Sequence, residues 1–304
     1  MTDHIYWKNG VLYLLDQREL PFRKTYVKCR TAGDVITAIN NMTVRGAPLL
    51  GIVAAYGMVL GVKEVVAAKR SVRRADIDRI AKKLGATRPT AVNLFWALRR
   101  MTEAFEGHAG DRDIAEDMLG EALAIHVEDI ENNRMLSLYG AELIEKGDTI
   151  MTHCNAGALA TGGYGTALGV MRAAHEAGKK IKVIATETRP YMQGSRLTVW
   201  ELMQEGIPVE LVPENHAGLL CSRGAVNKII TGADRIEGRM DGCRRHDGRF
   251  AIPHKCPRAP ERHTDRSPGL LGKGTCHSGD LVQGWGFTAW LALHTECVCR
   301  FGPV

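Results

Sequence analysis

Cys154 and Asp234 are the two residues whose types and settings best suit acid–base chemistry. Cys154 follows an apolar stretch and precedes a glycine-rich turn into an expected helix, where a thiolate is favoured. Asp234 also follows an apolar stretch with few other charges, a setting that favours general-acid use. Each has a plain structural alternative, because a cysteine packs well at a strand end and an aspartate often caps a turn.

Other residues suit a phosphate or a sugar. Arg45 and Arg88 each stand in a proline-containing turn that opens an expected helix, where a guanidinium would bind phosphate or hydroxyl groups. A surface ion pair is an equally good interpretation of both. The loop 155–165 contains four glycines and could offer backbone N–H groups to a phosphate, although it matches no Walker or dinucleotide motif. Gln193 could bond a sugar hydroxyl or simply start its helix.

An alternation of strands and helices from residue 149 onward would bring these residues together. The expected strands are 149–153, 180–186, 208–212 and 226–231, and the expected helices between them are 163–177, 193–205 and 217–223. This order predicts an α/β fold with a Rossmann-like, doubly wound parallel sheet. Ligands of such sheets bind beyond the carboxyl ends of the strands, where Cys154, Gln193 and Asp234 stand.

The part before residue 149 is expected to be mostly helical. Two short strands should flank the Asn9-Gly10 turn, and the expected helices are 32–41, 49–62, 91–106 and 112–146. We therefore predict a smaller, mostly helical N-terminal domain over 1–128 and a Rossmann-like catalytic domain over 129–236. An atypical tail then follows over 237–304.

The composition argues against several classes of protein. The net charge is +6, but the densest basic stretch, 69–74, adjoins acidic residues and suggests a solvated helix face rather than a nucleic-acid site. No apolar run is expected to span a bilayer, and no secretory signal is apparent, so we predict a cytoplasmic protein. Six of the eight cysteines follow position 220 without a CxxC pair, so no metal site is predicted.

Five segments in order resemble one family closely. They are 43–57, 88–94, 152–157, 187–194 and 232–236. This set is similar to the methylthioribose-1-phosphate isomerases of methionine salvage, a family shared with ribose-1,5-bisphosphate isomerases and with regulatory subunits of a translation-factor guanine-exchange complex. The resemblance covers about residues 5–236 of the chain.

The resemblance implies roles for particular residues. Cys154 and Asp234 match the family's catalytic pair, and the substrate-binding positions match Arg45, Gly46, Ala47, Arg88 and Gln193. It also implies a homodimer that acts on a sugar phosphate with no cofactor and no metal. The alternatives are a ribose-1,5-bisphosphate isomerase and a non-catalytic regulatory subunit.

The resemblance stops after Ile236. The family's Asn-Lys pair, which contacts substrate, is missing there, and the tail is rich in Cys, Arg and His without periodicity. We hypothesise a shifted reading frame or another replacement of the family sequence; the alternative is a divergent but folded extension. Translating the coding DNA in the other two frames tests this, because a family-like continuation should appear in one of them.

Overall fold

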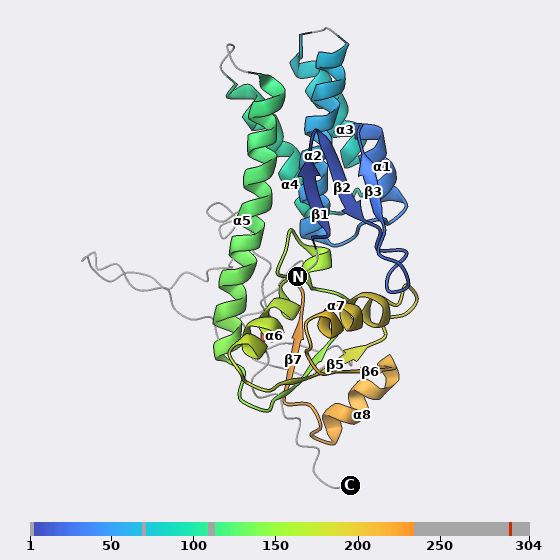
Figure 1. Ribbon diagram of the computed structural model, residues 1–304, viewed down its shortest axis with the longest axis vertical. Helices are drawn as coiled ribbons and strands as arrows, with labels where there is room; N and C mark the ends of the chain where they lie inside the picture. The colour runs from blue at the N-terminus through green and yellow to red at the C-terminus, as the bar shows by residue number, and fades with distance from the viewer. Residues whose placement is uncertain (1–2, 69–70, 109–112, 234–291, 294–304) are drawn as a thin grey trace, which may run out of the picture. The chain divides into compact units, whose positions relative to one another are not determined.

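The computed structural model of the chain describes residues 3–68, 71–108, 113–233 and 292–293 (Figure 1). All of them belong to one compact unit. Asp234 lies just outside these residues, as does nearly all of the predicted tail over 237–304. The hypothesis about that tail therefore remains a prediction.

A small antiparallel sheet opens the chain. It consists of β1 (Ile5–Lys8), β2 (Val11–Leu15) and β3 (Tyr26–Cys29), in the order β1-β2-β3. The predicted turn at Asn9 and Gly10 is confirmed, with φ values of 51° and 74° that suit a tight hairpin. Strand β3 is not predicted from the sequence because it is short and carries no turn signal of its own.

Five helices follow: α1 (Ala32–Asn40), α2 (Ala47–Ala67), α3 (Arg74–Gly85), α4 (Val92–Glu106) and α5 (Ile114–Glu142). Helix α2 contacts each of the other four. Gly57 and Gly61 allow this close packing, since a Cβ at either position would lie 2.9 Å from Val35 or Ile80. The mostly helical N-terminal part is thus confirmed.

Helix α2 corrects one expectation, because it is long and apolar enough to cross a bilayer. Its mean hydropathy reaches 1.8, yet 83% of that window is buried inside the protein, as in the core helix of a globular fold. The predicted domain boundary between residues 128 and 129 falls inside α5, so one continuous helix crosses it. That division of the chain remains a prediction.

The second half contains the predicted parallel sheet. Its strands are β4 (Thr149–Thr152), β5 (Lys182–Thr186), β6 (Val209–Val212) and β7 (Lys228–Thr231), in the order β6-β5-β4-β7, and a two-residue strand β8 (Ala292–Leu293) pairs antiparallel with β7. Successive strands run outward from β4 to β6, and the chain then returns to the other side of β4. The switch point of the sheet therefore lies between β4 and β7, where ligands of such folds bind.

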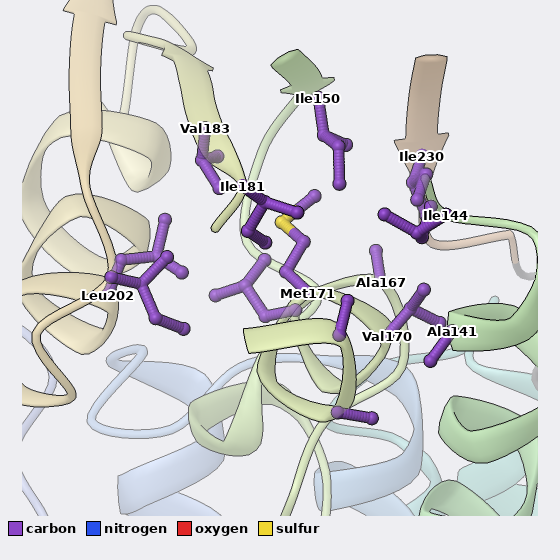
Figure 2. Close-up of a cluster of buried hydrophobic side chains, with 14 residues drawn as sticks. Ala141, Ile144, Ile150, Ala167, Val170, Met171, Ile181, Val183, Leu202 and Ile230 are labelled. Atoms are coloured by element: carbon purple, nitrogen blue, oxygen red, sulfur yellow. The ribbon is translucent and has the colours of Figure 1, made fainter. Parts of the chain in front are cut away.

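Helices α6 (Ala167–Glu176), α7 (Val199–Gln204) and α8 (Ala217–Ser222) alternate with these strands. The larger core forms where α6 and α7 meet the sheet, and Figure 2 shows Ile150, Val183 and Ile230 from three strands in one cluster with Met171 of α6. A smaller cluster of Met151, Ile184 and Val212 lies under α8. Two apolar layers therefore fix the strand ends that carry the candidate site.

Candidate active site

Cys154 lies two residues beyond the end of β4 in a left-handed backbone conformation, with φ of 62°. Two threonine hydroxyls hold this backbone. The Cys154 N–H donates to Thr188 Oγ1 at 2.9 Å, and Thr198 Oγ1 donates to the Cys154 carbonyl oxygen at 2.5 Å. A left-handed residue other than glycine costs roughly 1–2 kcal/mol, and such strain is typical of functional positions.

Asn155, the next residue, connects Cys154 to the N-terminal half of the chain. Arg45 Nη1 donates to Asn155 Oδ1 at 2.9 Å, and Arg45 Nη2 donates to the Asn155 carbonyl oxygen at 2.7 Å. Both side chains are buried, with exposures of 8% and 3%. The structure therefore brings together two of the predicted site residues, Arg45 and Cys154, through a residue to which the sequence had assigned no role.

Glu201 of α7 supports this arrangement. Its buried carboxylate accepts hydrogen bonds from Asn155 Nδ2 and from the backbone N–H of Ala158, each at 2.8 Å. Burial raises the pKa of Glu201, and the guanidinium of Arg172, 3.8 Å away, opposes the rise. Arg172 also forms an ion pair with Glu205 at 2.6 Å. A chain of buried polar contacts thus runs from Arg45 to the end of α7.

Part of the glycine-rich loop 155–165 is already paired within the protein. The Gly162 N–H donates to Asp129 Oδ2 at 2.6 Å, and the Ala158 N–H donates to Glu201 Oε2 at 2.8 Å, so these two groups are not open to a phosphate. Burial raises the pKa of Asp129 to about 6. The helix expected over 163–177 is α6, which starts at Ala167, and the N–H groups of Thr166 and Leu168 donate to the Ala156 carbonyl oxygen.

The remaining predicted substrate residues occupy two places. Gly46 precedes α2 with φ of 107°, and a Cβ there would lie 2.4 Å from the Ala160 carbonyl oxygen, so only glycine allows this contact with the loop after Cys154. Ala47 is the first residue of α2. Arg88 lies between α3 and α4, and its half-buried side chain forms no hydrogen bond or ion pair within the part of the chain described.

Gln193 stands in the segment that follows β5. Its Oε1 atom and the hydroxyl of Tyr191 are buried and have no hydrogen-bond partner among the described residues. Gly194, the next residue, passes so close to β5 that a Cβ would lie 1.6 Å from the Thr186 carbonyl oxygen. Because buried polar atoms without partners are rare, each of these oxygens suits contact with a polar ligand.

The end of β7 approaches the Cys154 loop. Strand β7 pairs with β4, and a Cβ on Gly232 would lie 2.8 Å from the Cβ of Ala156. Asp234 follows two residues later, outside the described residues, so its position relative to Cys154 stays a prediction. Within the described ranges, no group of three or more His, Cys, Asp or Glu residues could hold a metal ion.

The fold and site define a Rossmann-like α/β protein with a cysteine at the switch point of its sheet. The model of the initiation factor 2 subunit family matches residues 43–240, and the chain belongs to this family. A relative from Thermotoga neapolitana, named methylthioribose-1-phosphate isomerase, is 52% identical over 77% of this chain and 68% of its own length. A relative of the same name from Pelotomaculum thermopropionicum is 50% identical over 79% of this chain and 67% of its own length.

Two solved structures are also similar. The 5-methylthioribose 1-phosphate isomerase of Pyrococcus horikoshii is 40% identical, with a TM-score of 0.71 over 78% of this chain and 67% of that one. The translation initiation factor eIF-2B subunit delta from A. fulgidus is 44% identical, with a TM-score of 0.69 over 78% of this chain and 69% of that one. These likenesses confirm the predicted family and fold class.

Sequence reasoning missed the residues that hold Cys154 and Arg45 in place, namely Asn155, Thr188, Thr198 and Glu201. Asn155 and Thr188 lie in two of the segments that resemble the family, and Glu201 is an acidic residue in a helix that otherwise covers the core. Hydroxyl and amide groups carry no periodicity, so their partners emerge only from the tertiary structure.

Proposed function

We propose that this chain converts 5-methylthioribose 1-phosphate to 5-methylthioribulose 1-phosphate, an aldose–ketose isomerisation of methionine salvage. Relatives at about 50% identity carry the name of this enzyme. The structural observation that carries the proposal is Cys154, held in a left-handed conformation at the end of β4 beside the switch point of the sheet.

The substrate dictates the chemistry. Its phosphate blocks the anomeric oxygen, so the ring opens only when an acid protonates the ring oxygen and the C1–O bond breaks. We assign that proton to Asp234. A hydrogen then moves from C2 to C1, and the C2 hydroxyl gives its proton to the Asp234 carboxylate, which leaves a ketone and restores the acid. Cys154 either relays the C2 hydrogen as a proton or stabilises a direct hydride shift, and both routes balance without a cofactor or a metal.

Substrate binding falls to Arg45, Gly46, Ala47, Arg88 and Gln193 in this proposal. The guanidiniums suit the phosphate, since arginine binds phosphate through paired N–H donors. The unpartnered, buried Oε1 of Gln193 supports a bond from a sugar hydroxyl. The missing Asn-Lys pair after Ile236 leaves the phosphate to these arginines, which predicts weaker substrate binding than in the relatives.

Replacing the catalytic pair tests the proposal. Cys154→Ser and Asp234→Asn should each lower kcat for 5-methylthioribose 1-phosphate by about 100-fold or more while the thermal unfolding temperature stays unchanged. Cys221→Ser is the matched control, because Cys221 is an exposed thiol of α8 and its loss should leave kcat intact. Near-native turnover in either catalytic variant would refute the assignment.

Two alternatives belong in the same assay. A ribose-1,5-bisphosphate isomerase would prefer the doubly phosphorylated sugar. A translation-factor regulatory subunit would turn over neither sugar. This alternative is tested because the chain is similar to the A. fulgidus eIF-2B subunit. Cys154 at the switch point favours an enzyme, because a binding subunit has no need of a thiol there.

We also propose that the chain forms a homodimer in the cytoplasm and binds neither nucleic acid nor a membrane. Exposed apolar side chains on α5 and directly after it support self-association. They are Leu123, Val127, Met135, Leu138, Tyr139 and Leu143, with exposures of 41% to 63%. Light scattering on the purified full chain tests this, and a monomer at micromolar concentration would contradict the dimer.

A further inference from the structure

We propose that Asn155 is a positioning residue that orients the Arg45 guanidinium toward the substrate phosphate. The inference rests on the proposed function, which gives Arg45 its ligand. Asn155 contacts Arg45 with two different groups: its side-chain oxygen accepts from Nη1 at 2.9 Å and its backbone oxygen accepts from Nη2 at 2.7 Å. Because the contacts come from two nitrogens of one planar group, they fix the plane of the guanidinium as well as its position.

The orientation of the Asn155 amide is itself determined by its surroundings. Its Nδ2 donates to the Glu201 carboxylate at 2.8 Å and to Thr198 Oγ1 at 3.2 Å. A buried carboxylate accepts hydrogen bonds and does not donate them, so the amide nitrogen must face Glu201 and the amide oxygen must face Arg45. Glu201 thereby prevents the amide flip that would present a donor to the guanidinium.

The position of Asn155 in the chain gives this contact a consequence for catalysis. Asn155 directly follows Cys154, and the same Thr198 hydroxyl that receives its amide donates to the Cys154 carbonyl. One residue thus sets the separation between a phosphate-binding cation and the reactive thiol. Paired N–H donors bind phosphate strongly only in a fixed plane, and small displacements of positioning groups lower rates substantially.

Phosphate protection of the Cys154 thiol tests this without relying on turnover. The full chain is treated with iodoacetamide at increasing inorganic phosphate, and mass spectrometry follows alkylation of the peptide that contains Cys154. Asn155→Ala should raise the half-protecting phosphate concentration by about tenfold, the loss expected for a charge-assisted contact. With the sugar substrate, KM should rise by a similar factor, more than kcat falls.

Asn133→Ala is the matched control. Asn133 is another buried asparagine, also 3% exposed, whose Nδ2 donates to a buried acid, Asp129, at 2.9 Å. It has no contact with Arg45, so its loss should lower stability while the half-protecting phosphate concentration stays within about twofold. If Asn155→Ala does not fold, Asn155→Ser takes its place.

A double-mutant cycle separates positioning from general stability. Arg45→Lys keeps the charge but cannot form the two planar contacts, so Asn155→Ala should add less than about twofold to it. Additive effects, equal shifts in the Asn133→Ala control, or native Cys154 that phosphate fails to protect would each overturn the inference. If phosphate protects and the cycle is non-additive while no isomerase turnover occurs, the inference stands and only the proposed reaction fails.

Discussion

Thr198 Oγ1 donates a hydrogen bond to the carbonyl oxygen of Cys154 at 2.5 Å and thereby ties the start of α7 to the candidate catalytic residue. Thr198 is fully buried and ends a π-helical turn, Gly194–Thr198, that leads into α7. Such turns often occur at functional sites, because the extra residue redirects side chains. Helix α7 therefore shapes the site as well as covering the core.

Thr198→Val should lower kcat by about tenfold or more, because the Cys154 carbonyl loses its donor and the left-handed backbone loses one of its two restraints. The free energy of unfolding should fall by about 1–3 kcal/mol for the buried carbonyl left without a partner. Steady-state kinetics and urea unfolding measure both. The control is Thr102→Val in α4, whose hydroxyl donates to the Leu98 carbonyl at 2.8 Å; equal kinetic losses in both variants would contradict this role.

Glu201→Ala should be among the most destabilising changes in the chain. It removes one of the two acceptors of the Asn155 amide, leaves the Ala158 N–H without its acceptor and removes a carboxylate that faces Arg172. Losing one member of a buried charge network typically costs about 3–5 kcal/mol, which urea unfolding measures. Glu210→Ala is the comparison, because its ion pair with Lys182 is half exposed and contributes at most about 1 kcal/mol. Equal losses of stability in the two variants would count against the buried network.

Gly194→Ala should destabilise the protein by about 3 kcal/mol or more, since the new Cβ would lie 1.6 Å from the Thr186 carbonyl and the backbone must shift. Gly120→Ala on α5 should instead stabilise it by about 0.5–1 kcal/mol, because a Cβ at Gly120 would meet nothing within 4 Å and alanine favours a helix. Urea midpoints compare the two. Similar midpoints for both variants would argue against tight packing at Gly194.

Asp129 should make stability depend on pH. Burial raises the pKa of Asp129 from 3.8 to about 6, so between these values the folded state keeps a proton that the unfolded chain has released. The contribution of the Asp129 carboxyl group to the free energy of unfolding is therefore fully present below about pH 4 and is lost as the pH rises through about 6. Relative to the native protein, Asp129→Asn should gain up to about 3 kcal/mol between pH 4 and pH 7.

Urea unfolding of both proteins across this range measures that difference. The asparagine keeps an acceptor oxygen for Gly162 while removing the titration. Burial lowers the pKa of nearby His126, which destabilises the fold as the pH falls below 6.5, but His126 is present in both proteins and cancels. A difference in unfolding free energy that is independent of pH would contradict the role of Asp129.

The sequence by itself determined most of the elements and their order. Hydrophobic periodicity and glycine caps located the four parallel strands and most of the helices, and the strand–helix alternation predicted their sheet. Strand β3 was not predicted, and α3 was not among the expected helices. Because ligands of such sheets bind at the carboxyl ends of the strands, the predicted end of the first parallel strand also indicated Cys154. Local patterns succeed here because the buried face of each helix or strand is formed by apolar residues at regular spacing within that element.

Only the tertiary structure decided what surrounds Cys154. The contacts from Arg45 to Asn155 and from Asn155 to Glu201 span 110 and 46 residues of chain. Hydrogen bonds between such distant residues leave no period in the sequence, because they depend on where whole elements dock. The same reason explains why the sequence did not show that Asp129 and Glu201 accept hydrogen bonds from backbone N–H groups of the glycine-rich loop.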